Sequence, residues 1–126
     1  MAQWINERFG IVAETEPRER GVLVLNIADL KDGHNNTNEI KKKLMIGLQL
    51  LEHAETRLLI ECKGGISRSP TIAAGILAIQ QNINLTTSLD QVARKVPRTQ
   101  YNYDLVDSLK KTLKSMPQYR HLVDTP

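Results

Sequence analysis

The sequence predicts an α/β fold with a small, mostly parallel central sheet flanked by helices. Two apolar runs, at residues 22–27 and 58–60, have the composition of strands, and an amphipathic helical pattern separates them. Three more helical patterns follow the second run. Strands that alternate with helices are typical of a parallel sheet that carries its functional groups at the carboxyl ends of the strands.

The composition is that of one globular domain spanning residues 1–126. Only five residues are aromatic, so we expect a core of Leu, Ile, Val and Ala. The balance of 17 basic and 14 acidic residues gives a net charge of +3, which suits a phosphorylated substrate but is too small to indicate nucleic acid binding. We see no signal peptide and no long apolar run, and therefore expect a cytoplasmic protein without a membrane span.

Cys62 is the only cysteine of the chain. A single cysteine excludes an internal disulfide and a metal site built from several cysteines. The three histidines are scattered without the spacing of metal ligands. We therefore expect neither a metal nor a cofactor.

The chain before the first predicted strand is short. Residues 1–9 carry a few large apolar side chains among polar neighbours, which indicates a short strand or an arm packed on the body of the protein. Residues 14–21 are charged and contain Pro17, and they predict a surface connection. The run at 22–27 is almost entirely Val, Leu and Ile, the pattern of a strand buried on both faces.

A long polar loop at residues 29–38 follows this strand, and long polar loops beside a sheet often carry chemistry. The next helix is predicted to have Thr37 or Asn38 as its cap. It should bury apolar residues that recur at helical spacing: Ile40, Leu44, Leu48 and Leu51. The crossover then brings Cys62 next to the end of the first strand.

Three helices should account for most of the remaining chain. Residues 69–81 are apolar on most sides, so we expect this helix at the centre. A shorter helix begins near residue 87 and stops before Pro97. The last helix runs over residues 102–116, with Asn102 as its expected cap, and a polar C-terminal tail follows it.

The loop after Cys62 is the segment around which the function is organised. It contains five residues before Arg68, two of which are glycine: Lys63, Gly64, Gly65, Ile66 and Ser67. Glycine allows such a loop to turn successive backbone N–H groups toward one anion. The helix N-terminus adds further N–H groups and the positive end of its dipole. We therefore expect these residues to bind a phosphate group.

Arg68, Ser69 and Pro70 stand where the helix should begin. Ser69 is a suitable N-cap and Pro70 a suitable first helical residue. Arg68 can bind two phosphate oxygens with its planar guanidinium. A phosphate held in this way would face the Cys62 sulfur, and the same positive field would favour the nucleophilic thiolate.

The motif from Cys62 to Ser69 resembles the signature of the cysteine-based protein tyrosine phosphatases, and residues 65–71 look most like the dual-specificity branch. The resemblance implies a dual-specificity phosphatase-like fold. It also implies an enzyme that removes phosphate from phosphotyrosine, and from phosphoserine or phosphothreonine, through a phosphocysteine intermediate. The expected partners are phosphorylated proteins or peptides, with inorganic phosphate or vanadate as ligands. The Ser69 hydroxyl would hydrogen-bond the Cys62 sulfur and ease its departure, although a purely capping role is the alternative.

In the family that this motif resembles, an aspartate on the loop after the upstream strand protonates the leaving group. Asp29 ends the stretch 25–29, which is similar to the family's strand-then-aspartate pattern. We expect Asp29 to be this acid and later the base that activates water. Asp32 is the alternative acid. Either residue could instead be an ordinary turn or capping residue.

Three other residues have two interpretations each. Lys63 could favour a highly charged substrate or could simply be solvated. Residues 96–102 resemble the loop that precedes the last helix of dual-specificity enzymes. Gln100 or Asn102 could therefore touch substrate or water, although a helix cap is the expected role of Asn102.

Glu61 departs from the family pattern, which usually has histidine before the cysteine. An ionised carboxylate at this position would disfavour the thiolate unless a base is paired with it. Two alternative functions therefore stay open. One is a catalytically weak phosphate-binding interaction module, and the other is a phosphatase for phosphoinositides or for the 5′ phosphates of RNA.

Overall fold

The computed structural model describes residues 1–124, which contain four strands and five helices. The strands are β1 (Gln3–Trp4), β2 (Phe9–Ala13), β3 (Leu23–Asn26) and β4 (Leu58–Cys62). The helices are α1 (Thr37–Leu51), α2 (Arg68–Gln81), α3 (Leu85–Lys95), α4 (Tyr103–Lys114) and α5 (His121–Asp124). The predicted α/β class is confirmed.

The strands form one sheet in the order β1-β2-β4-β3. β4 pairs in parallel with both β2 and β3, and only β1 is antiparallel to its neighbour. The three parallel strands therefore end at the same edge of the sheet, where Cys62 is aligned with Ala13, and Glu61 with Asn26. The mostly parallel sheet is confirmed, and so is the position of Cys62 near the end of β3.

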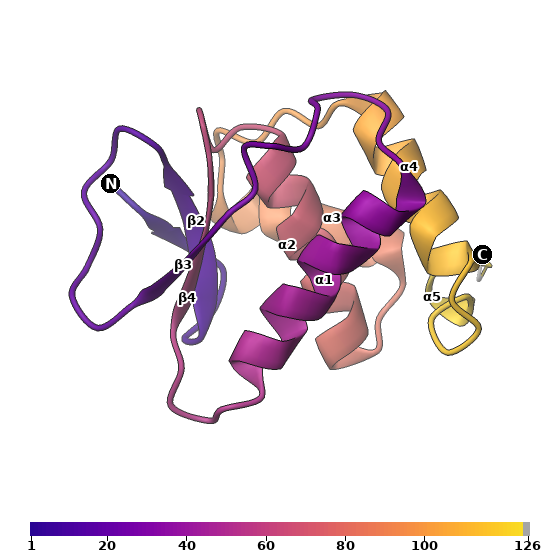
Figure 1. Ribbon diagram of the computed structural model, residues 1–126, viewed down its shortest axis with the longest axis horizontal. Helices are drawn as coiled ribbons and strands as arrows, with labels where there is room; N and C mark the ends of the chain where they lie inside the picture. Colours follow the sequence, from indigo (N-terminus) through magenta and orange to yellow (C-terminus); the bar gives the residue numbers. More distant parts are fainter. Residues whose placement is uncertain (125–126) are drawn as a thin grey trace.

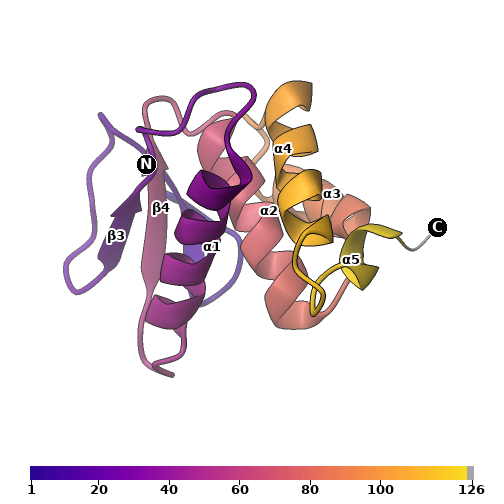
Figure 2. The same ribbon diagram turned by 45° about the vertical axis from the view of Figure 1, so that its right-hand side comes forward.

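All the helices lie on one side of the sheet, and the connection between β2 and β3 lies on the other (Figures 1 and 2). α1 and α2 contact the strands directly, α3 packs on α2, and α4 packs on α1 and α2. α2 is the central helix, as predicted, because every residue from Ser69 to Ala78 is buried. The N-terminus of this central helix faces the edge of the sheet at which β4 ends.

β3 is an edge strand, and the prediction that it is buried on both faces is wrong. Leu23 is 47% exposed and Asn26 is also exposed, whereas Leu25 is buried. The reason is that helices cover only one face of the sheet and no strand pairs with the outer edge of β3. An apolar run in the sequence does not distinguish this arrangement from burial on both faces.

β2 is a strand that the sequence pattern did not predict. All five of its residues are buried, and the strand lies between β1 and β4. Gly10 stands where the backbone of β1 approaches closely, since a Cβ atom at this residue would lie 2.5 Å from the carbonyl oxygen of Gln3. The sequence predicted either a short strand or a packed arm for the N-terminal segment. The structure has the short strand, β1, and β2 follows it in the same sheet.

The C-terminal part of the chain contains more structure than the predicted polar tail. α4 ends before Pro117, as predicted, and the short helix α5 follows with Leu122 buried. The last two residues of the predicted tail, 125–126, lie outside the described residues. Within residues 1–124, no helix combines the length and the apolar character that crossing a membrane requires.

Candidate active site

The loop between β4 and α2 folds back over the Cys62 sulfur. Cys62 is buried, and its Sγ accepts a hydrogen bond from the backbone N–H of Gly65 at 3.3 Å. Gly65 has a φ of +63°, in the left-handed region that favours glycine. A Cβ atom there would also lie 2.8 Å from Nη2 of Arg98, but this end of a flexible side chain can shift, so the positive φ is the main reason for glycine. The loop thus turns one backbone donor toward the sulfur, and the binding of a phosphate group by this loop stays a prediction.

A cleft of about 270 Å³ opens beside the sulfur. It is lined by residues of the phosphate loop and of two other segments: Asp32, Cys62, Gly64, Ile66, Ser67, Arg68 and Gln100. A nucleophilic sulfur, a cation and a carboxylate therefore share one cavity at the N-terminus of the central helix. This combination suits the binding and transfer of a phosphoryl group.

Arg68 joins the phosphate loop to the loop that follows β3. Its Nη1 donates hydrogen bonds to the carbonyl oxygens of Ala28 at 2.8 Å and Leu30 at 3.0 Å. The structure gives Nε and Nη2 no hydrogen-bond partner among residues 1–124. Two donors of the planar guanidinium are therefore available to the oxygens of an anion.

Ser67 is the N-cap of α2, and the prediction that Ser69 holds this position is wrong. The helix begins with Arg68, so Ser69 and Pro70 are its second and third residues. Ser69 is fully buried, and within residues 1–124 its Oγ has no hydrogen-bond partner. A buried hydroxyl without a partner costs about 1–3 kcal/mol.

The two candidate acids lie in different surroundings. The side chain of Asp29 is 64% exposed, forms an ion pair with Lys43 Nζ at 3.0 Å, and lines a separate hollow with Leu30 and Lys31. The hydrogen bond from Lys43 lowers the pKa of Asp29 below its usual value. Asp32 lines the cleft with Cys62, and its Oδ1 accepts a hydrogen bond from Ser67 Oγ at 2.7 Å. The structure brings Asp32 to the nucleophile and does not bring Asp29 there.

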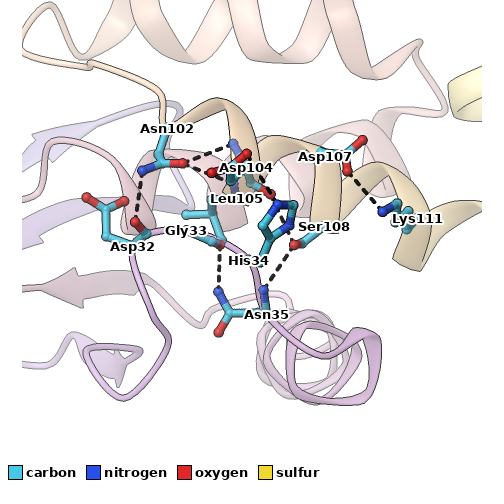
Figure 3. A network of polar contacts seen from close by, with 10 residues as sticks. All are labelled: Asp32, Gly33, His34, Asn35, Asn102, Asp104, Leu105, Asp107, Ser108 and Lys111. Carbon is cyan, nitrogen blue, oxygen red and sulfur yellow. Dashed lines mark hydrogen bonds and ion pairs between the residues drawn. The ribbon is translucent and has the colours of Figure 1, made fainter.

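The loop that carries Asp32 is also fastened to α4 (Figure 3). Nδ2 of Asn102 donates to the carbonyl oxygen of Asp32 at 2.8 Å, and the backbone N–H of Asn35 donates to Ser108 Oγ at 3.0 Å. His34 Nε2 lies 3.3 Å from a carboxylate oxygen of Asp104. The predicted capping role of Asn102 is confirmed, since its Oδ1 accepts from the first backbone N–H groups of α4. Its contact with the acid loop could not be read from the sequence.

Glu61 is 1% exposed and is paired with a base, which is the condition that the sequence left open. Its Oε2 accepts two hydrogen bonds from Arg18, one from Nε at 2.8 Å and one from Nη2. Its Oε1 accepts from Nδ2 of Asn26 at 2.7 Å. Alternation along β4 directs the side chains of Glu61 and Cys62 to opposite faces of the sheet. The carboxylate beside the nucleophile is thus balanced by a guanidinium from the segment between β2 and β3.

Arg98 supports the phosphate loop from the outside. Its Nε donates to the carbonyl oxygen of Gly65 at 3.3 Å, and its Nη2 forms an ion pair with Glu16 at 2.8 Å. The Arg98 guanidinium lowers the pKa of Glu16 to about 2. The backbone N–H of Gln100 donates to the carbonyl oxygen of Ile66 at 2.8 Å, so the segment before α4 holds two carbonyls of the loop. Lys63, by contrast, is exposed.

Comparisons with known proteins show that the fold of the chain is similar to that of solved phosphatase structures. No family model and no curated protein sequence matches the chain. The structure of human DUSP28 has a TM-score of 0.75 at 14% identity and covers 91% of this chain and 94% of its own. Tk-PTP in its active form has a TM-score of 0.65 at 20% identity, covering 88% of this chain and 95% of its own. PTPMT1 in complex with PI(5)P has a TM-score of 0.69 at 16% identity, with 90% of this chain and 95% of its own covered. The chain therefore has the fold of the cysteine-based tyrosine phosphatases, in the form found in the dual-specificity enzymes.

Proposed function

We propose that this protein hydrolyses phosphoric monoesters through a phosphocysteine intermediate on Cys62. The observation that carries the proposal is the cleft in which Cys62, Arg68 and Asp32 meet at the N-terminus of α2. The phosphate would lie in the loop of residues 63–67, bound by backbone N–H groups and by Nε and Nη2 of Arg68. The likeness in fold to known phosphatases agrees with this chemistry.

The first step forms a bond between Cys62 Sγ and phosphorus and breaks the bond between phosphorus and the leaving oxygen. Asp32 in its protonated form gives its proton to that oxygen. Oδ1 already accepts from Ser67, and Oδ2 has no partner among residues 1–124, so Oδ2 carries the transferred proton. Arg68 and the loop amides hold the three equatorial oxygens of the phosphoryl group.

The second step transfers the phosphoryl group to water. Asp32 takes a proton from the attacking water, the bond between sulfur and phosphorus breaks, and the electron pair returns to Cys62 as a thiolate. The hydroxyl of Ser69, which is buried and has no hydrogen-bond partner among residues 1–124, would donate a hydrogen bond to the departing sulfur. This role agrees with the finding that Ser67, and not Ser69, caps the helix.

The structure supports Asp32 over Asp29 as the general acid. A proton donor must reach the leaving oxygen, and only Asp32 lines the cleft that contains Cys62. The ion pair with Lys43 holds Asp29 in its charged form, which cannot donate a proton. We accordingly assign the acid and base roles to Asp32, in place of the residue that the sequence pattern favoured.

The proposed substrates are phosphorylated proteins or peptides, with phosphotyrosine as the main residue and phosphoserine or phosphothreonine as further ones. Ile66 lines the cleft with an exposed apolar side chain that can pack against a phenyl ring. The pairing of Glu61 with Arg18 removes the main argument for a protein that only binds phosphate. A structural neighbour, PTPMT1, is seen with a phosphoinositide, so phosphoinositides belong in the substrate panel.

Hydrolysis of p-nitrophenyl phosphate tests the proposal. The wild-type protein should turn over this substrate at about pH 5 to 8, a range between the ordinary pKa values of a carboxyl group and of a thiol. Cys62→Ser should abolish turnover, while vanadate still binds. Asp32→Asn and Asp29→Asn form a matched pair that changes the same charge at neighbouring positions. Only Asp32→Asn should lower the rate, and the loss should be largest, roughly 10²-fold or more, for a substrate such as phenyl phosphate whose leaving group needs a proton. Turnover that persists in Cys62→Ser, or a wild-type protein without turnover, would contradict the proposed enzymatic function.

A further inference from the structure

Asn102 contacts both the acid loop and α4 (Figure 3). Its backbone N–H also contacts Ser67 of the phosphate loop. We propose that Asn102 is a positioning residue for the general acid, a role that rests on the proposed function of Asp32. Asn102 does not line the cleft and does not touch the reacting atoms. It acts on the reaction through Asp32, along two separate hydrogen-bond paths.

The first path fixes the backbone of the acid. Nδ2 of Asn102 donates to the carbonyl oxygen of Asp32 at 2.8 Å. This carbonyl belongs to the same residue as the reacting carboxyl group, so holding it restricts the position of the Asp32 side chain directly. A displacement of a catalytic group by about 1 Å can lower a rate by about 10²-fold, so such a restraint bears on the rate.

The second path fixes the carboxyl group itself. The backbone N–H of Asn102 donates to Ser67 Oγ at 3.2 Å, and Ser67 Oγ in turn donates to Asp32 Oδ1 at 2.7 Å. Because Ser67 Oγ accepts from Asn102, its one proton is directed to Asp32. Oδ1 is therefore held as an acceptor, and the proton for transfer resides on Oδ2.

Ser67 gives independent support for this path. A serine at the N-cap of a helix usually accepts a hydrogen bond from the first turn with its hydroxyl. Ser67 is the N-cap of α2, but its side chain makes no capping hydrogen bond. The hydroxyl instead connects Asn102 with Asp32. The Ser67 hydroxyl therefore contacts Asp32 and does not stabilise the N-terminus of α2 by capping it.

The third contact of Asn102 connects both paths to a rigid element. Its Oδ1 accepts from the backbone N–H groups of Asp104 at 3.0 Å and Leu105 at 3.3 Å, which holds the side-chain amide in one orientation. α4 is firmly seated, since Leu105, Leu109 and Leu113 are fully buried. The position of the acid is therefore set by a packed helix as well as by its own loop.

Asn102→Ser separates positioning from capping. Serine is as good an N-cap as asparagine, so the helix keeps its cap, but the donor to the Asp32 carbonyl is lost. Asn84→Ser is the matched control, because Asn84 caps α3 by accepting from the N–H of Thr86 at 2.8 Å and lies on another helix. Both variants should keep the circular dichroism spectrum and melting temperature of the wild type.

The informative measurement is kcat for two substrates that differ in their need for an acid. Phenyl phosphate releases a phenol with a pKa of about 10, as phosphotyrosine does, whereas p-nitrophenol leaves with little help. Asn102→Ser should lower kcat about 10-fold for phenyl phosphate and less than about 3-fold for p-nitrophenyl phosphate, since only part of the acid contribution of about 10²–10⁴ is lost. Asn84→Ser should leave the ratio of the two rates unchanged.

A double-mutant cycle shows whether Asn102 acts through the acid. In the Asp32→Asn background, Asn102→Ser should have no further effect on kcat for phenyl phosphate. Ser67→Ala interrupts the second path alone and should give the same selective loss, which provides a test should Asn102→Ser fail to fold. Equal losses for both substrates, or a loss that persists without Asp32, would overturn the proposal. A wild-type protein without Cys62-dependent turnover would instead overturn the proposed function.

Discussion

The ion pair between Arg18 and Glu61 allows a sharp prediction about stability. Glu61 is buried in the central strand, and both donors of Arg18 bind the same carboxylate oxygen. In Arg18→Gln, the Glu61 carboxylate keeps only the neutral amide of Asn26 as a hydrogen-bond partner among residues 1–124. We expect this variant to be clearly less stable than the wild type, because a buried carboxylate would lose its counter-ion.

The magnitude follows from the burial of the two side chains. Breaking a buried ion pair by removing one partner costs about 3–5 kcal/mol. The side chain of Arg18 is 50% exposed, so water can replace part of the lost contact and the cost should fall to roughly 1.5–3 kcal/mol. For a chain of this size such a loss lowers the melting temperature by about 5–10 °C.

Urea and thermal unfolding of three variants would measure this pair. Glu61→Gln removes the buried charge and should cost less than Arg18→Gln, and the double variant should be more stable than Arg18→Gln alone. Alkylation of Cys62 by iodoacetamide should also be slower in Arg18→Gln, since the unbalanced carboxylate disfavours the thiolate. An Arg18→Gln variant within about 0.5 kcal/mol of the wild type would refute the reasoning, because surface substitutions commonly fall in that range.

Three further predictions concern other contacts of the site. The Arg98 guanidinium lowers the pKa of Glu16 from 4.5 to about 2. The contribution of Glu16 to the free energy of unfolding is therefore complete above pH 4.5 and is lost as the pH falls toward 2. Glu16→Gln should cost about 2–3 kcal/mol in urea unfolding at pH 7 and progressively less in acid. A loss of stability that stays the same at every pH would argue against the ion pair. Gly65→Ala should lower the free energy of unfolding by at least about 1–2 kcal/mol, approximately the penalty of its positive φ, and should weaken vanadate binding. Gly64→Ala is its control, because a Cβ atom there would meet only Ile66 at 3.4 Å, and it should lower the melting temperature less. Ser69→Ala should leave stability within about 1 kcal/mol and produce a burst of p-nitrophenol as the phosphocysteine accumulates; unchanged steady-state kinetics without a burst would contradict its role.

Local patterns in the sequence predicted most of the helices and strands of the fold. The spacing of four apolar residues predicted α1: Ile40, Leu44, Leu48 and Leu51. All are buried except Leu48, which is half-buried. The edge position of β3 could not be predicted, because an apolar run does not reveal whether a neighbour lies on each side. β2 was missed since its five residues adjoin a segment with mixed composition, and its place in the sheet depends on pairing with distant β4.

The candidate site was predictable where it is contiguous in the sequence. Cys62 and Arg68 are separated by one loop, so their meeting at the helix N-terminus followed from the motif alone. The choice between Asp29 and Asp32 depended on which residue the loop turns toward the cleft, and that is set by Ser67 and Asn102 from elsewhere in the chain. The counter-ion of Glu61 is Arg18, which likewise comes from a distant segment, the connection between β2 and β3 on the side of the sheet away from the helices. Such long-range contacts leave no spacing pattern in a single sequence.

The hydrogen bonds from Arg68 to the carbonyls of Ala28 and Leu30 have a consequence for how this protein can change. The same guanidinium that would bind the phosphate also holds the backbone that leads to Asp32. An insertion or deletion in this stretch would shift the arginine together with the acid, so affinity and leaving-group protonation would change in the same variant. Adaptation to a new substrate is therefore easier at Ile66 or Lys63, on the exposed side of the phosphate loop, than in the length of the loop after β3.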